Sequence, residues 1–218
     1  AGPKVLEHIV DAVLELSGER TGQYRLLRAI KNRFGPTDEV GVFEVVEAGM
    51  AEVKNPSAAF LENRVEGSPG SAIACVIEGT RPLMIEVQAL VIHSPMPNPR
   101  RVARGIPVSK IQVLAAVLEK FCGLTLSTSD IYVNVAGGFT ITETAADLGL
   151  AMAIASSYMS RPIKSGTVYV GEVGLLGEVR KVKLLEKRLK EGKRLGFTKV
   201  IAPPDIHSIQ EVISGLKR

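Results

Sequence analysis

One acidic residue stands near the start of an otherwise apolar segment. The stretch TETAADLGLAMAIASSY, residues 142–158, predicts a buried helix that carries Asp147 close to its N-terminal end. A carboxylate in the first helical turn interacts favourably with the helix macrodipole and accepts hydrogen bonds from free backbone N–H groups, and this structural role is the one we favour. Two carboxylates with raised pKa values would instead indicate acid–base chemistry or a divalent metal site.

A second candidate site is the motif IKNRFG, residues 30–35. Lys31 and Arg33 flank one residue at the end of a predicted strand, so both cations lie on the same side and could hold a phosphate. The alternative is a basic strand end on a solvated surface. The motif by itself leaves both interpretations open.

Two basic clusters are candidates for contact with a phosphate backbone. The first lies in NPRRVARGIPVSK, which we interpret as a mobile loop leading into a helix, and comprises Arg100, Arg101, Arg104 and Lys110. The second follows one face of a predicted helix and comprises Lys183, Lys187, Lys190 and Arg194. The alternative for the second cluster is a solvated helix face that Glu186 and Glu191 partly neutralise.

Composition restricts the class of protein. The 218 residues are 45% hydrophobic and 23% charged, as in a globular protein, and the net charge of +4 weakly favours an anionic partner. No apolar run approaches the ~20 residues of a membrane helix, and the start of the sequence has no targeting pattern. Cys75 and Cys122 form no CxxC motif and the histidines lack ligand spacing, so we expect no disulfide, no metal site and a reducing compartment.

The order of elements predicts an α/β fold of the α+β type. Residues 1–54 hold an antiparallel β-meander that is too small to stand alone, and the Pro-, Gly- and Ser-rich residues 55–70 read as a linker. From residue 71 to 218, strands and helices alternate. We expect strands at 71–78, 83–92, 130–136, 167–173 and 199–202, and helices at 108–121, 144–159 and 182–195.

Long stretches of the chain resemble the RadA (Sms) recombination proteins. They include YRLLRAIKNRFGPTDEVGVFE, NPSAAFLENR, EGTRPLMIEVQALV, NPRRVARG and GEVGLLGEV, and KNRFG is the signature of that family. In RadA proteins a zinc finger and a RecA-like ATPase precede a domain similar to the peptidase domain of Lon. The resemblance implies that residues 1–54 are the last strands of the ATPase core and residues 71–218 the Lon-like domain.

The resemblance also implies a role for the cations of KNRFG. Lys31 and Arg33 would reach across a subunit boundary to the ATP of a neighbour and stabilise charge on the transferred phosphoryl group. The chain contains no GxxxxGK[ST] motif. We therefore expect no cofactor in this chain, and ATP with Mg²⁺ in a full-length parent.

In Lon peptidases a serine nucleophile begins the helix that resembles residues 145–158, and a lysine on the following helix takes its proton. The resemblance places Asp147 at the serine position and Glu186 at the lysine position, with Lys187 one residue away. A carboxylate is a poor nucleophile toward an amide. We therefore expect that this chain is not an enzyme, whereas its full-length parent is a DNA-dependent ATPase.

The resemblance implies DNA repair through homologous recombination, by branch migration of recombination intermediates. The Lon-like domain would be a non-proteolytic ring scaffold and DNA-binding module. The implied partners are DNA, further copies of the chain in a hexameric ring and a RecA-type recombinase, in the bacterial cytoplasm or an organelle.

The hairpin GEVGLLGEV, residues 171–179, is a candidate ring contact or a plain two-strand corner. Two alternatives stay open: a Lon-type serine peptidase and a pure oligomerisation module.

Overall fold

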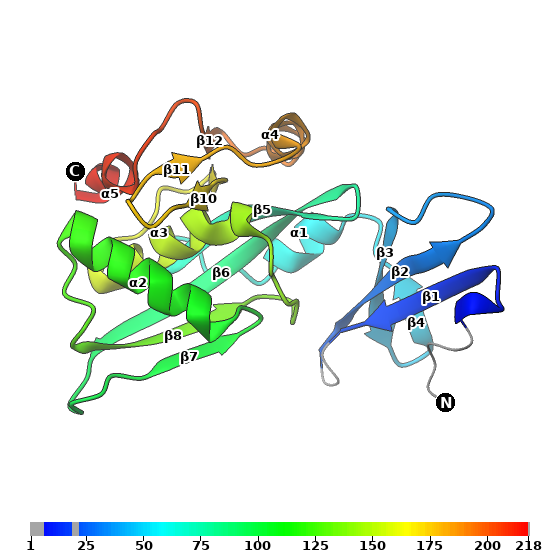
Figure 1. The fold of residues 1–218 in the computed structure, drawn as a ribbon, viewed down its shortest axis with the longest axis horizontal. Helices are drawn as coiled ribbons and strands as arrows, with labels where there is room; N and C mark the ends of the chain where they lie inside the picture. Colours follow the sequence, from blue (N-terminus) through cyan, green and yellow to red (C-terminus); the bar gives the residue numbers. More distant parts are fainter. Residues whose placement is uncertain (1–6, 19–21, 218) are drawn as a thin grey trace.

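The computed structural model describes residues 7–18 and 22–217. Figure 1 shows a small sheet of N-terminal strands beside a larger body in which helices surround a second sheet. The α/β class predicted from the sequence is confirmed, because helices and strands alternate along the larger body. Its finer assignment to a Lon-like fold stays a prediction.

The small sheet is an antiparallel meander in the order β1-β2-β3-β4, as predicted. Its strands are β1 (Ala12–Ser17), β2 (Tyr24–Asn32), β3 (Val40–Val46) and β4 (Gly49–Glu52). Tyr24 and Leu26 are buried, whereas Leu14, Ile30 and Phe34 are 63%, 52% and 81% exposed. Because so much apolar surface stays in solvent, this sheet has too small a core of its own and depends on the larger body.

Three aromatic rings join the small sheet to the larger body. The rings of Tyr24 and Phe60 are 5.0 Å apart, and those of Phe60 and Phe139 are 4.4 Å apart. Phe60 belongs to α1 (Pro56–Leu61), which lies inside the predicted linker 55–70 and packs on the larger sheet. The aromatic contact therefore fixes the residues that connect the two parts.

The larger sheet has the strand order β12-β9-β5-β6-β8-β7. Its strands are β5 (Ser71–Glu78), β6 (Arg81–His93), β7 (Arg101–Arg104), β8 (Ser129–Val135), β9 (Thr167–Tyr169) and β12 (Lys199–Ile201). The β5–β6 and β6–β8 pairs are antiparallel, and the β7–β8, β5–β9 and β9–β12 pairs are parallel.

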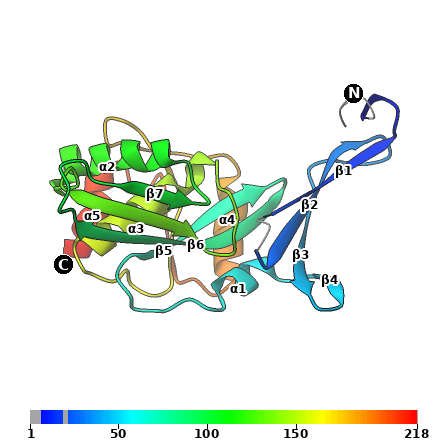
Figure 2. The same cartoon turned by 90° about the horizontal axis from the view of Figure 1, so that it is seen from below.

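The helices cover both faces of this sheet, and Figure 2 shows α2 and α1 on opposite sides. The helices not yet placed are α2 (Val108–Cys122), α3 (Asp147–Tyr158), α4 (Leu185–Arg194) and α5 (Ile209–Lys217). Successive side chains of β5 point to opposite faces. Ala72 and Ala74 belong to the core beneath α2, α3 and α5, whereas Ile73 and Cys75 belong to the core beneath α4.

The start of α3 is fixed by close packing against β5. A Cβ atom on Gly149 would lie 2.9 Å from the Cβ atom of Ala74, so only glycine lets the helix approach the strand this closely. The 3₁₀ turn η2 (Thr144–Ala146) leads directly into α3. The position of Asp147 therefore follows from the contact between Gly149 and Ala74.

Most predicted elements are confirmed, but the structure differs from the prediction in three places. The segment NPRRVARG was predicted as a loop, and this is wrong: it contains strand β7, which pairs with β8 through backbone groups that its arginine-rich sequence does not reveal. The predicted helix 182–195 begins only at Leu185, because Leu184 has a left-handed φ of 55°. The predicted strand 167–173 is divided into β9 and the first strand of a hairpin, β10 (Glu172–Val173) with β11 (Val179–Arg180).

Candidate functional site

Asp147 is paired with a lysine from a neighbouring helix. Lys110 lies in the first turn of α2, and its Nζ is 2.6 Å from Oδ1 of Asp147 and 3.1 Å from the carbonyl oxygen of Glu143. Only 16% of the Lys110 side chain and 8% of the Asp147 side chain are exposed. The ion pair ties the N-terminal end of α2 to that of α3.

Opposing effects act on the pKa of Asp147. Burial raises the pKa of this carboxyl above its ordinary value, and the hydrogen bond and charge of Lys110 oppose the rise without cancelling it. The backbone of Val173, in the hairpin, also lowers the pKa. Asp147 is the first residue of α3, as predicted for an acid in the first helical turn.

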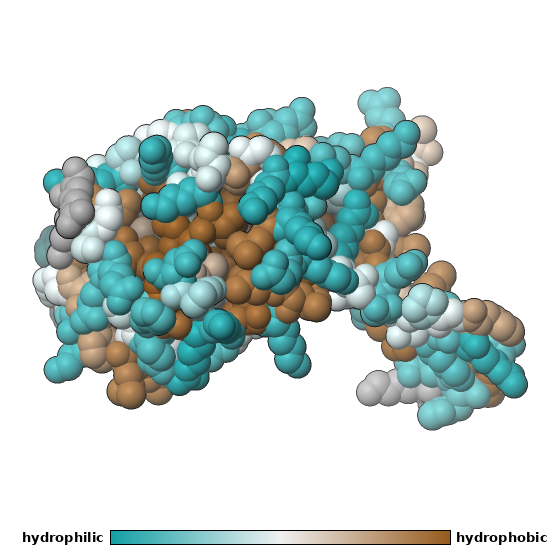
Figure 3. All heavy atoms as spheres, turned by 90° about the horizontal axis from the view of Figure 1, so that it is seen from above, coloured by the Kyte–Doolittle hydropathy of each residue, from teal (hydrophilic) through white to brown (hydrophobic). Residues whose placement is uncertain are grey.

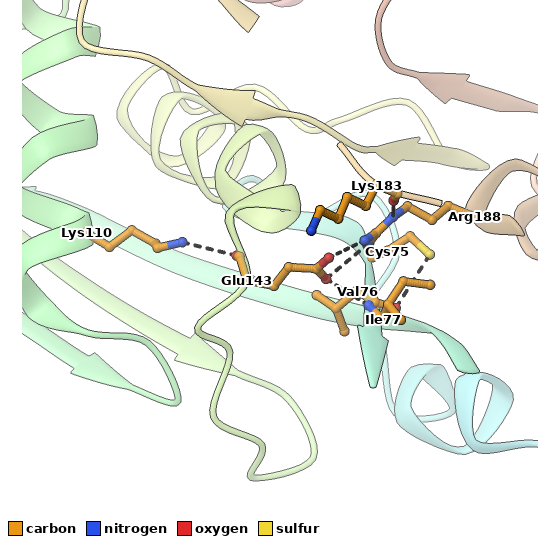
Figure 4. A network of polar contacts seen from close by, with 7 residues as sticks. All are labelled: Cys75, Val76, Ile77, Lys110, Glu143, Lys183 and Arg188. Carbon is orange, nitrogen blue, oxygen red and sulfur yellow. Dashed lines mark hydrogen bonds and ion pairs between the residues drawn. The ribbon is translucent and has the colours of Figure 1, made fainter. Parts of the chain in front are cut away.

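A second polar network lies beside this pair and was not predicted from the sequence. Arg188 of α4 is completely buried, and its side chain forms an ion pair with Glu143, which follows the loop after β8. The same guanidinium donates to the carbonyl oxygens of Cys75, at 2.6 Å, and Lys183, at 3.1 Å. Figure 4 shows Arg188 between Glu143 and β5, with Lys110 reaching Glu143 from the other side.

Glu143 is the residue that connects the two polar pairs. Its carboxylate accepts hydrogen bonds from Arg188 and from the backbone N–H of Ile77, at 2.8 Å, while its carbonyl oxygen accepts from Lys110. One signal in the sequence could have identified Arg188. It lies three residues after Leu185 and four before Gly192, on the helix face that packs inward.

The structure does not bring together the two positions that resemble the Lon serine and lysine. Glu186 is exposed on α4, and among the described residues no hydrogen bond or ion pair joins it to Asp147. Asp147 is instead held by Lys110. A serine–lysine pair needs a nucleophile and a base within hydrogen-bond reach, and residues 147 and 186 provide neither the residue types nor such a contact.

The two cations of KNRFG lie at the end of β2. Lys31 Nζ donates to the carbonyl oxygen of Glu7 at 2.7 Å. Arg33 forms an ion pair with Asp11 at 3.1 Å, and 74% of its side chain is exposed. The exposed guanidinium is available to a further partner, and its role toward ATP stays a prediction.

The cations of the first basic cluster differ in their surroundings. The Arg101 guanidinium donates to three carbonyl oxygens, those of Arg100, Leu126 and Ser129, at 3.0, 2.8 and 2.5 Å. Lys110 is held by Asp147, as described above. Arg100 and Arg104 are exposed, so they are the members of this cluster that reach solvent most fully.

The second basic cluster lies in and before α4. Lys183 precedes the helix, and Lys187 and Lys190 lie on it; all three are exposed. Arg194 forms an ion pair with Glu191 at 2.7 Å. The predicted helical stripe is therefore shorter than expected, because Lys183 lies outside α4. Whether these cations contact DNA stays a prediction.

Two kinds of site or segment are absent from the described residues, 7–18 and 22–217. No group of three or more His, Cys, Asp or Glu side chains in these residues could hold a metal ion. No helix among them is long and apolar enough to span a membrane.

Several proteins named DNA repair protein RadA are similar to the chain over nearly all of it. The relative from Halalkalibacterium halodurans is 51% identical over 203 residues, which are 93% of this chain and 44% of the relative. The relative from Bacillus subtilis is 50% identical over 203 residues, again 93% and 44%. A relative from Streptococcus pyogenes is 46% identical over 217 residues, which are 100% of this chain and 48% of the relative. The chain is homologous to these RadA proteins. It spans about half the length of the RadA relatives that it matches.

A second comparison corrects one prediction. The family described as subunit ChlI of Mg-chelatase matches residues 103–206, from β7 to the segment beyond β12. We expected from the sequence that this chain is not an enzyme. That expectation is wrong, because the matched family is by its name a subunit of an enzyme, Mg-chelatase.

Proposed function

We propose that this chain is the C-terminal part of a RadA-type DNA repair protein that acts in homologous recombination, by driving branch migration of recombination intermediates. The observation that carries the proposal is the 46% identity over 217 residues to a protein named DNA repair protein RadA, of which the chain covers 48%. The full protein is a DNA-dependent ATPase that uses ATP and Mg²⁺ in the bacterial cytoplasm. Its further partners are copies of itself in a hexameric ring and a RecA-type recombinase.

In this proposal the KNRFG cations act on a nucleotide held by a neighbouring subunit. Arg33 supports the idea because 74% of its side chain is exposed at the end of β2. Two fixed cations at that place would stabilise the charge that develops on the transferred phosphoryl group. The β2 strand also contains Tyr24, whose ring packs on Phe60 and thereby connects the motif to the larger body.

The larger body serves as a Lon-like ring scaffold. The β10–β11 hairpin is the candidate contact between subunits, because Leu175 and Leu176 at its turn are 70% and 78% exposed. Figure 3 shows apolar residues gathered over the middle of one face of the molecule, with hydrophilic residues around them. Such a patch is characteristic of a protein interface.

The larger body also carries the proposed DNA surface. Lys183, Lys187 and Lys190 are exposed, and among the described residues none of them forms an ion pair. Arg100 and Arg104 add two exposed cations on and beside β7. Cations of this kind neutralise backbone phosphates and release counterions, so they bind duplex DNA without reading its sequence.

The test is DNA binding by the chain, measured by fluorescence anisotropy of a labelled duplex over a series of salt concentrations. The variant Lys187→Ala/Lys190→Ala should weaken binding and flatten the slope of log affinity against log salt by about one to two units, because each phosphate contact contributes about 0.9. The control variant Lys54→Ala/Lys120→Ala removes the same charge from exposed positions outside both clusters. Equal effects of the two variants would refute the proposed DNA surface.

A Lon-type peptidase is the second candidate, and one measurement tests it. The contact between Lys110 and Asp147 occupies the position that resembles the Lon nucleophile. We therefore expect no hydrolysis of casein by the chain. Sustained hydrolysis that disappears in Asp147→Ala would favour the peptidase over the scaffold.

A further inference from the structure

A pocket of about 420 Å³ opens at the β9–β12 edge of the larger sheet, away from both basic clusters. Four parts of the chain form it: β9, β12, α5 and the segment that follows α3. The lining residues are Arg161, Pro162, Lys164, Thr167, Tyr169, Lys199, Ile201, Val212, Gly215 and Leu216. The volume is in the range of sites that bind small organic ligands.

The register of two parallel strands directs alternate side chains into this pocket. Thr167 pairs with Lys199, and Tyr169 pairs with Ile201. These four side chains share one face because side chains of a strand alternate. The residue between them on β9, Val168, belongs to the core on the opposite face. The pocket therefore has a rigid floor made of two paired strands.

Two hydroxyl groups of this floor open into the pocket. Thr167 and Tyr169 are each only 4% exposed. Among the described residues, neither side-chain hydroxyl forms a hydrogen bond with the protein, and no fully buried side-chain oxygen lacks a partner, so both hydroxyls are accessible from the pocket. Burial raises the pKa of Tyr169 to about 12, so the phenol keeps its proton and is a hydrogen-bond donor at neutral pH. A hydroxyl that opens into a pocket can donate a hydrogen bond to a bound ligand.

The walls of the pocket carry positive charge. Lys164 and Lys199 are exposed at its edge, and neither forms an ion pair among the described residues. Arg161 donates to the carbonyl oxygen of Leu216 at 3.0 Å and so joins the segment after α3 to α5. No acidic side chain lines the pocket in the described part of the chain. The electrostatic field of the site therefore favours an anion.

We propose that this pocket binds the phosphate group of a nucleotide, with Lys164 and Lys199 neutralising the charge and the Tyr169 and Thr167 hydroxyls donating to phosphate oxygens. The apolar side chains of Pro162 and Val212 would cover part of the sugar or base. The same chemistry fits a free mononucleotide or the 5′-phosphate at the end of a DNA strand. The proposal does not depend on the proposed function, because it rests on residues outside both basic clusters.

The test is calorimetric titration of the 218-residue chain with AMP, with inorganic phosphate and with adenosine, at ligand concentrations up to about 10 mM. AMP should bind, and adenosine should bind at least about tenfold more weakly because it lacks the phosphate. Tyr169→Phe removes only the hydroxyl and should weaken AMP binding about tenfold. Lys164→Ala/Lys199→Ala should weaken it at least as much.

The control variant Lys120→Ala/Lys193→Ala removes two exposed cations outside the pocket and should leave AMP binding unchanged. A thermal melt of each variant shows that the fold is retained. Competition then identifies the source of the phosphate: displacement of AMP by a 5′-phosphorylated oligonucleotide, but not by its 5′-hydroxyl form, indicates a strand end, and no displacement by either indicates a free nucleotide. The proposal fails if AMP does not bind, or if Tyr169→Phe and the Lys164/Lys199 variant bind it as the wild type does.

Discussion

The Nζ atom of Lys110 lies 2.6 Å from Oδ1 of Asp147, and this ion pair closes the contact between the N-terminal ends of α2 and α3. Both side chains are mostly buried, so the pair has little access to solvent. A buried charge that loses its partner is much more costly than a buried pair that is removed as a whole. The first prediction follows from this difference.

Lys110→Met should lower the free energy of unfolding by about 3 kcal/mol or more, because it leaves the Asp147 carboxylate buried without its partner. Lys110→Met combined with Asp147→Leu should be less destabilising than Lys110→Met alone. Urea unfolding followed by circular dichroism measures both values. A double variant that is less stable than the single variant would contradict the role of the pair.

The stability of the chain should depend on pH through Asp147. Because its pKa in the folded state is raised above the ordinary value of 3.8, the fold prefers the protonated carboxyl. The stability that this group contributes is present below its unfolded pKa and is lost as pH rises through the folded pKa. Asp147→Asn cannot titrate, so its unfolding free energy relative to the wild type should rise with pH above about 4 and then level off.

Urea unfolding of the wild type and Asp147→Asn between about pH 4 and pH 8 measures this difference. The titrations of the other carboxyl groups cancel in the comparison. Asp130 is a suitable control, because hydrogen bonds led by the Arg100 backbone lower its pKa. Between about pH 4 and pH 8 the stability difference between Asp130→Asn and the wild type should therefore stay nearly constant, because a lowered pKa places its change below about pH 4. A flat difference for Asp147→Asn would show that its pKa is not raised.

Arg188→Met should destabilise the fold by about 3 kcal/mol, because it removes a buried ion pair and leaves the Cys75 carbonyl without its donor. Arg188→Lys keeps the charge but lacks the planar fork of donors, so it should restore less than half of the loss. Lys187→Met, at the neighbouring exposed position, is the control and should change stability by less than about 0.5 kcal/mol. Full restoration by lysine would show that charge alone is needed.

Lys31→Ala and Arg33→Ala should lower ATP turnover of the full-length protein without unfolding this part of it. The Arg33–Asp11 pair is exposed on both sides and contributes little to stability. The melting temperature of the 218-residue chain should therefore stay within a few degrees of the wild type. A large fall in melting temperature would instead show that these residues are structural. The loss of ATP turnover would then result from unfolding and not from a lost contact with ATP.

Local patterns predicted much of the fold. The apolar run of α3, the meander of β1 to β4 and the alternation of strands and helices after residue 70 all have short-range signatures, and the structure contains them. Strand β7 was not predicted, because its sequence is rich in arginine. It is a strand because its backbone pairs with that of β8. The start of α4 was placed too early because the left-handed backbone of Leu184 leaves no mark in the hydrophobic pattern.

The sequence by itself determined which residue types are present at the candidate positions: a carboxylate at 147, another at 186 and two cations in KNRFG. Only the tertiary structure decided which of them meet. Lys110 and Asp147 are 37 residues apart, and Glu143 and Arg188 are 45 apart, so no local pattern relates them. Their contacts arise because α2, α3 and α4 pack on the two faces of one sheet, and a buried charge is stable only where such packing brings it a partner.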